Sequence, residues 1–158
     1  MRATNQIERL QFFLPLVGGD EDAAALLVQV GDLVRIADDI ADQEEADPQE
    51  AMADLMTIAL AEIPANPFYD ANRLHLSHLL GGMFAQWRLS NRFHRSGDEK
   101  KETFGFVLRE SPEQFALHVI ALCVGWPAAT TAYEASLYPV IAARTAGETV
   151  TTWSEEVA

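Results

Sequence analysis

Two short stretches of this sequence carry the same helix-start signal, and no stretch carries a strand pattern. In Asp47-Pro48-Gln49-Glu50 and Ser111-Pro112-Glu113-Gln114 a capping residue precedes a proline, and an acidic residue follows. Proline suits the first helical position because the N–H that it lacks would have no helical partner there. Alternation of apolar and polar residues, which marks a half-buried strand, reaches no useful length. The sequence therefore predicts an all-α protein, a compact helical bundle of six or seven helices.

Glycine, proline and asparagine residues set the expected ends of these helices. Gly18 and Gly19 end the first helix, and the Pro64–Pro67 stretch separates the third from the fourth. We expect Pro139 to kink or end the last helix, because proline clashes with the preceding helical turn. The expected helices cover about residues 5–17, 20–45, 48–63, 69–94, 99–109 and 112–125, with a last one from residue 127.

The length of 158 residues and the hydrophobic content of 49% are typical of one soluble globular domain. We expect a single domain over residues 1–146 and a polar, flexible tail over residues 147–158. The lone Cys123 excludes an internal disulfide and favours a reducing, cytoplasmic location. The longest apolar run, residues 115–126, is shorter than the roughly 20 residues of a membrane helix, so we expect no membrane association.

The formal net charge of −13 is concentrated on one part of the chain. Between Asp20 and Glu62 there are thirteen acidic residues and one basic residue, Arg35, so this segment alone carries −12. Such a field repels nucleic-acid backbones and attracts cations or a basic surface. We therefore expect no nucleic-acid binding, and we expect a basic protein partner or a homo-oligomer.

The expected second helix has one apolar face and one acidic face. Its apolar residues are spaced 4, 3, 4 and 3 apart, as in the core-facing stripe of a helix: Leu26, Val30, Leu33, Ala37 and Ile40. Asp38, Asp39 and Asp42 project to the side away from this stripe. They are either a solvated face or a magnesium site, since two or three carboxylate oxygens with water and phosphate are the usual ligands of Mg²⁺. Asp32 and Asp39 also flank Ile36 at the edge of the stripe.

The stretch LVRIADDIAD, residues 33–42, resembles the first aspartate-rich motif of the squalene and phytoene synthases, which have the class I isoprenoid synthase fold. The resemblance implies a helical bundle in which Asp38, Asp39 and Asp42 bind magnesium ions that hold a substrate diphosphate. A second aspartate-rich motif, which that family carries on a later helix, is not found in this sequence.

The stretch WRLSNRFHR, residues 87–95, is the second unusual group of polar residues. Arg88, Arg92 and Arg95 form a basic stripe, and Asn91 and His94 continue the line of the apolar stripe beside it. These five residues are candidates to bind a phosphate or a carboxylate. The alternative is that the arginines pair with the acidic second and third helices. Upstream, Gly81-Gly82 in mid-helix indicates a close helix crossing or a kink.

His118 is the one polar residue within FALHVIALC, so we expect it to be buried and hydrogen-bonded in the core. No GxSxG, P-loop, GxGxxG, HExxH or CxxC motif occurs, so common nucleophile, nucleotide and zinc signatures are absent from the sequence. The residues expected in the core are Leu33, Ala37, Ile40, Leu80, Met83, Trp87, Phe115, His118, Val119 and Leu122.

Two hypotheses about function follow. In the first, the chain is a non-catalytic small acidic helical domain that acts in protein–protein interaction or homo-oligomerisation. In the second, it is a magnesium-dependent enzyme or binding site for a diphosphate compound, with the metal on Asp38, Asp39 and Asp42 and the phosphate on Arg88 and Arg92. The sequence leaves open whether the protein is an enzyme, and magnesium is the one cofactor that it suggests.

Overall fold

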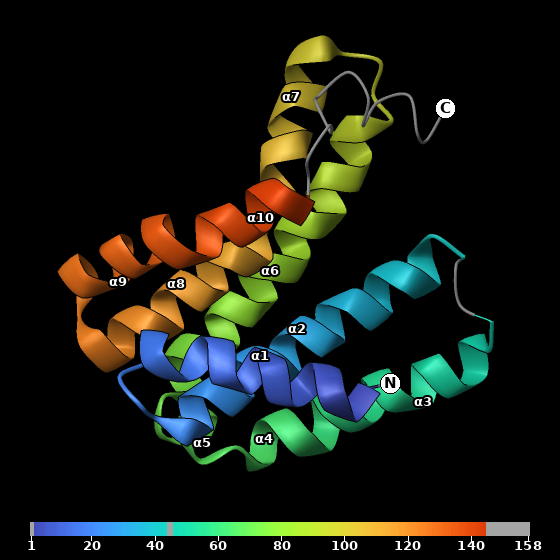
Figure 1. Ribbon diagram of the computed structural model, residues 1–158. Helices are drawn as coiled ribbons and strands as arrows, with labels where there is room; N and C mark the ends of the chain where they lie inside the picture. Colours follow the sequence, from blue (N-terminus) through green and yellow to red (C-terminus); the bar gives the residue numbers. More distant parts are fainter. Residues whose placement is uncertain (1, 44–45, 145–158) are drawn as a thin grey trace. The chain divides into compact units, whose positions relative to one another are not determined.

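The computed structural model describes residues 2–43 and 46–144, and every regular element in them is helical (Figure 1). Several elements follow one another without a break, so the described residues form seven continuous helices of ten residues or more and one short helix, α5. The all-α prediction and the predicted six or seven helices are confirmed. The elements, where η marks a π-helical segment, are α1 (Arg2–Leu16), α2 (Glu21–Ala41), α3 (Pro48–Thr57), η1 (Ile58–Glu62), α4 (Ile63–Ala65), α5 (Pro67–Ala71), α6 (Arg73–His94), α7 (Glu99–Leu108), α8 (Ser111–Val124), α9 (Trp126–Ala132), η2 (Tyr133–Leu137) and α10 (Tyr138–Arg144).

Side-chain caps are present at the starts of four described helices, α2, α3, α5 and α7. The carboxylate of Asp47 accepts hydrogen bonds from the backbone N–H groups of Gln49 and Glu50, as the sequence predicts. Asp20 caps α2 in the same way. The prediction for Ser111 is wrong, because this residue is the first residue inside α8 and is buried. Its hydroxyl donates to the carbonyl oxygen of Met83 at 3.3 Å and so joins α8 to α6.

Both π-helical segments end just before a proline that lies inside a helix. Pro64 follows η1 and Pro139 follows η2. In an α-helix, the proline ring clashes with the carbonyl four residues earlier, which here belongs to Leu60 or Ala135. Both carbonyls lie in the π-helical turns, where the wider turn replaces the α-helical bond that proline would break. This is why Pro139 does not end the last helix, which continues to Arg144.

Backbone contacts divide the chain into two units. The first unit comprises the described residues up to Leu76 together with Leu122–Val124; the second comprises residues 77–121 and the described residues from Gly125 onward. The expectation of a single domain over residues 1–146 stays a prediction. The predicted tail, residues 147–158, lies outside the described residues. In the part of the chain that the structure describes, no helix is long and apolar enough to cross a bilayer.

Helix α2 is the centre of the first unit. It contacts α1, α3, η1, α4 and α5, and its buried residues lie on all sides of its first four turns. Beyond Ile36 the burial decreases, so that Ala37 and Ile40 are only half-buried and α2 ends at Ala41, four residues before the predicted end. Asn66, buried in the break between α4 and α5, donates to the carbonyl oxygen of Asp22 at 2.9 Å and so holds this corner against α2.

In the second unit, α8 buries Phe115, Ala116, Val119 and Ile120. This face is rotated relative to the predicted stripe, so the prediction that Leu122 is buried is wrong, and its side chain is 44% exposed. Among the other expected core residues Leu33, Met83, Phe115 and Val119 are buried, whereas Ala37, Ile40, Leu80, Trp87 and His118 are half-buried. His118 Nδ1 donates to the carbonyl oxygen of Gln114 at 2.7 Å, and its ring packs edge-on against Trp126.

Two leucines on α6 give a matched test of this packing. Leu76 is fully buried and Leu74 is 83% exposed. We expect Leu76→Ala to lower the free energy of unfolding by about 2–5 kcal/mol, because the substitution removes buried apolar atoms and leaves a cavity. Leu74→Ala should change it by less than about 0.5 kcal/mol. Urea unfolding followed by circular dichroism measures both, and equal effects would show that α6 is rotated from its described position.

Candidate functional site

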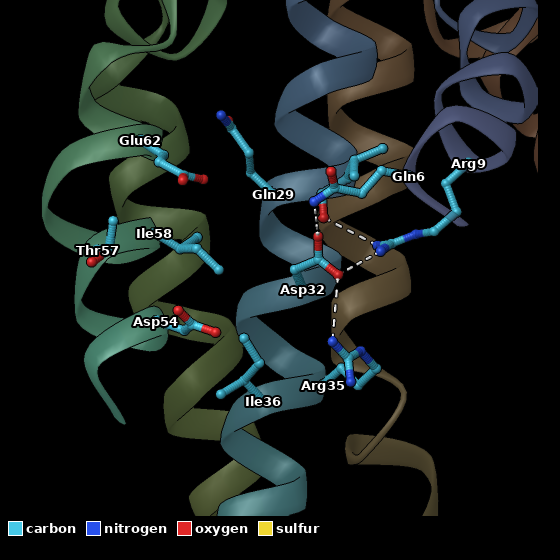
Figure 2. A pocket seen from close by; sticks show the side chains of 11 residues that line it. Gln6, Arg9, Gln29, Asp32, Arg35, Ile36, Asp54, Thr57, Ile58 and Glu62 are labelled. Atoms are coloured by element: carbon cyan, nitrogen blue, oxygen red, sulfur yellow. Dashed lines mark hydrogen bonds and ion pairs between the residues drawn. The ribbon is translucent and has the colours of Figure 1, made fainter. Parts of the chain in front are cut away.

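The first unit contains a groove between α1, α2 and the continuous helix α3–η1 (Figure 2). Its floor is apolar, because Val28, Ile36 and Ile58 are buried. Its rim is polar and comes from three helices that are distant in sequence, a combination that sequence periodicity does not reveal. The lining residues are Gln6 and Arg9 from α1, Val28, Gln29, Asp32, Arg35 and Ile36 from α2, and Asp54, Thr57, Ile58 and Glu62 from α3–η1.

An ion pair between α1 and α2 closes one side of this groove. Arg9 and Asp32 point toward one another in Figure 2, with Arg9 Nη1 2.6 Å from Asp32 Oδ1. The same guanidinium donates through Nη2 to the carbonyl oxygen of Val28 at 3.1 Å. Gly31 makes this approach possible, since a Cβ at this position would collide with Arg9 Nη2. Asp32 is only 14% exposed, so this pair is better shielded from water than an ordinary surface ion pair.

Further polar contacts extend from Asp32 along α2. Gln6 Nε2 donates to Asp32 Oδ2 at 3.4 Å, and Arg35 Nη2 lies 3.8 Å from Asp32 Oδ1. Arg35 also donates through Nη1 to Asp39 Oδ2 at 3.2 Å. Asp39, one of the predicted metal ligands, is therefore part of a charge network whose best-shielded member is Asp32.

The other two predicted metal ligands lie at the end of α2. Asp38 and Asp42 are exposed, and Asp42 is the residue that ends the helix, with its backbone N–H donating to the carbonyl oxygen of Asp38. Among residues 2–43 and 46–144, no three or more His, Cys, Asp or Glu side chains are grouped to hold a metal ion. The assignment of Asp38, Asp39 and Asp42 to magnesium stays a prediction.

The structure brings four of the five predicted anion-binding residues together. Arg88, Asn91, Arg92 and Arg95 line one hollow on α6, whereas the half-buried His94 is not among its lining residues. Within the described part of the second unit, no carboxylate forms an ion pair with any of these three arginines. Their predicted pairing with the acidic second and third helices stays a prediction.

Within the described part of the second unit, the glycine pair in α6 does not mark a close crossing. The helix runs unbroken from Arg73 to His94, and no described atom of this unit lies within 4 Å of a Cβ added at Gly81 or Gly82. Two glycines in a helix interior cost roughly 1 kcal/mol each relative to alanine. The described part of the second unit thus makes no contact with α6 at Gly81 that would offset this cost.

Cys123 is not an activated nucleophile. Burial, together with the smaller effect of the nearby charge of Asp20, raises the pKa of its thiol to about 11. The thiol is therefore protonated at neutral pH, whereas reactive cysteines have a lowered pKa. Burial likewise raises the pKa of Tyr133, with Glu113 and Glu110 adding to the effect.

Sequence reasoning missed Arg9, Gly31, Asp54 and Glu62 as members of one site. One signal was available: Asp32 is a charged residue among the largely apolar residues in the middle of α2. A carboxylate inside a largely buried helix needs a partner, and α1 supplies Arg9. Comparison with protein-family models, with curated proteins and with solved structures finds no match to this chain.

The groove predicts different roles for two arginines that contact the same carboxylate. We expect Arg9→Ala to lower the free energy of unfolding by about 1.5–3 kcal/mol, because it removes charge-assisted hydrogen bonds from the shielded Asp32. Arg35 is 50% exposed, so Arg35→Ala should cost less than about 1 kcal/mol. Urea unfolding of both variants tests this, and an Arg35→Ala effect as large as that of Arg9→Ala would contradict it.

Proposed function

We propose that this protein is a non-catalytic helical domain that forms a homo-oligomer through the outer face of α3–η1. The observation that carries the proposal is a row of three exposed apolar side chains on that face. Met52, Met56 and Leu60 follow one another at intervals of four residues and are 46%, 47% and 68% exposed. We call them the α3 row.

The α3 row is not needed for the fold of the first unit. The opposite face of the same helix buries Ala51, Ile58 and Ile63 and so holds it in place. An exposed apolar row lowers the solubility of a protein unless another surface covers it, and such rows mark interaction sites. Methionine is frequent on binding surfaces because its flexible, polarizable side chain adapts to the partner.

The chemistry of the groove supports binding or structure rather than catalysis. Asp32, its best-shielded carboxylate, accepts from Arg9 and Gln6 and faces Arg35. The oxygens of this carboxylate are therefore already engaged by partners within the first unit. The net charge of −13 also selects for a partner surface with basic groups near the apolar contact.

Self-association tests the proposal directly. We expect the molar mass of the wild-type protein, measured by light scattering and sedimentation velocity, to rise with concentration. The double variant Met56→Glu with Leu60→Glu should remain a monomer at every concentration, because it places charge in the apolar contact, and its circular dichroism should be unchanged.

Val107→Glu is the matched control. Val107 is 61% exposed and lies on α7, outside the α3 row, so this variant should associate like the wild type. The proposal fails if the wild-type protein is monomeric throughout, or if Val107→Glu reduces association as much as the double variant does.

A second candidate function is a magnesium-dependent site for a diphosphate compound. The observation that favours it is the hollow on α6, where Arg88, Asn91, Arg92 and Arg95 lie together without a carboxylate partner in the described part of their unit. Arginine is well suited to bind phosphate because its guanidinium donates two parallel hydrogen bonds. Asp38, Asp39 and Asp42 would hold the metal.

Thermal melts with divalent cations separate the two candidates. For an interaction domain we expect Mg²⁺ and Ca²⁺ to raise the melting temperature slightly and alike, as any acidic surface does. Asp38→Asn with Asp42→Asn should then stabilise the protein by a few tenths of a kcal/mol, since like charges four residues apart repel. A saturable rise with Mg²⁺ alone, lost in the double variant, would favour the diphosphate site instead.

A further inference from the structure

A second exposed surface lies on α6, and it carries small residues where the α3 row carries long side chains. Gly81, Ala85 and Leu89 follow one another at intervals of four residues, and all three are exposed. Two of these positions have no side chain or only a methyl group, and no described atom lies within 4 Å of a Cβ added at Gly81. Together with the exposed Arg88 and Arg92 beside Leu89, we call these residues the α6 face.

Small residues on a helix surface allow another helix to approach closely, because the distance between two packed helices is set by the side chains at their contact. The described chain makes no use of the opening at Gly81, although a glycine in a helix interior has a cost in stability. An approaching row of long, unbranched side chains would use it. Met52, Met56 and Leu60 form such a row on α3–η1.

The charges of the two faces are opposite. The α3 row lies between the exposed Glu50 and Glu62, in the segment that carries −12. The α6 face carries Arg88 and Arg92, which have no carboxylate partner within the described part of their own unit. Opposite potentials on two surfaces steer their encounter and fix the orientation in which they dock.

The two rows also have a similar length. The first and last members of each are eight residues apart, which is about 12 Å along an α-helix. Three protruding side chains on one helix therefore face three positions on the other, and one acidic end of the α3 row comes near the arginines beside Leu89.

We propose that the α3 row of one copy of this chain docks along the α6 face of a second copy, so that the copies associate head to tail. The proposal rests on the proposed homo-oligomer and names its second surface. Such an interface is heterologous: each copy uses one face and leaves the other available for a further copy.

Mixing two variants tests the proposal. The first, Met56→Glu with Leu60→Glu, blocks the α3 row; the second, Arg88→Glu with Arg92→Glu, blocks the α6 face. Each alone should be monomeric by light scattering, because every contact needs both faces. A 1:1 mixture should form a dimer of twice the monomer mass, since each variant supplies the face that the other lacks, and the blocked faces prevent further growth.

The same experiment distinguishes the failure of this inference from the failure of the proposed function. If the arginine variant still associates while the row variant does not, the α3 rows pair with each other, so the proposed function stands and the head-to-tail inference is wrong. If neither variant loses association, both are wrong. If both are monomeric and their mixture is monomeric too, the two faces do not bind one another.

Two variants that add a leucine test the shape of the α6 face without changing charge. Gly81→Leu fills the opening, and we expect it to lower the association constant about tenfold or more. Ala128→Leu is the control, because Ala128 is also exposed on a helix but lies on α9, outside both the α6 face and the α3 row. Equal effects of the two variants would overturn the docking geometry.

In addition, 0.5 M NaCl should weaken association by screening the arginines and acids, and unchanged association would overturn the role of charge.

Discussion

The burial of helix α2 is the constraint on which the first unit depends. A helix with buried apolar residues on all sides of its first four turns can be stable in water only if other helices surround it, and α1, α3, η1, α4 and α5 do so. The polar residues near its middle then need partners. Asp32 obtains one because Gly31 lets the guanidinium of Arg9 lie against the α2 backbone, where it also satisfies the carbonyl of Val28. The charge network of the groove follows from this arrangement.

A proline also affects the backbone of each of the two composite helices, α3–η1–α4 and α9–η2–α10. Pro64 and Pro139 each lie inside a continuous helix, and each comes two residues after the end of a π-helical segment. The first of these turns, η1, lines the groove with Ile58 and Glu62 on one side and carries Leu60 of the α3 row on the other. The same local widening that accommodates a proline therefore also helps to set which residues face α2 and which face water.

Charge is distributed unevenly over the two units. The first unit carries the acidic helices and the α3 row, and the second carries arginines and small residues on α6. Within the described part of the second unit, no carboxylate forms an ion pair with Arg88, Arg92 or Arg95. Arginines beside an open helix face are the kind of surface that an acidic, apolar partner recognises, and the chain itself carries such a surface. This complementarity is what connects the proposed function to the head-to-tail arrangement.

The sequence by itself determined the helical class, the positions of most helices and the cap at Asp47. These depend on residues close together in the chain: a carboxylate reaching the next turn, a proline at a first position, an apolar repeat. It also indicated that Arg88, Asn91, Arg92 and Arg95 lie together, because residues three and four apart share one face of a helix.

Only the tertiary structure decided which side of each helix is covered. The buried face of α8 differs from the predicted one, so that Leu122 is exposed. Ser111 contacts Met83 instead of capping the helix, and Arg9 forms an ion pair with Asp32. Each of these outcomes depends on the position of a helix far away in the sequence. Local periodicity specifies that a helix has an apolar side, but the neighbour that meets that side is specified by packing alone.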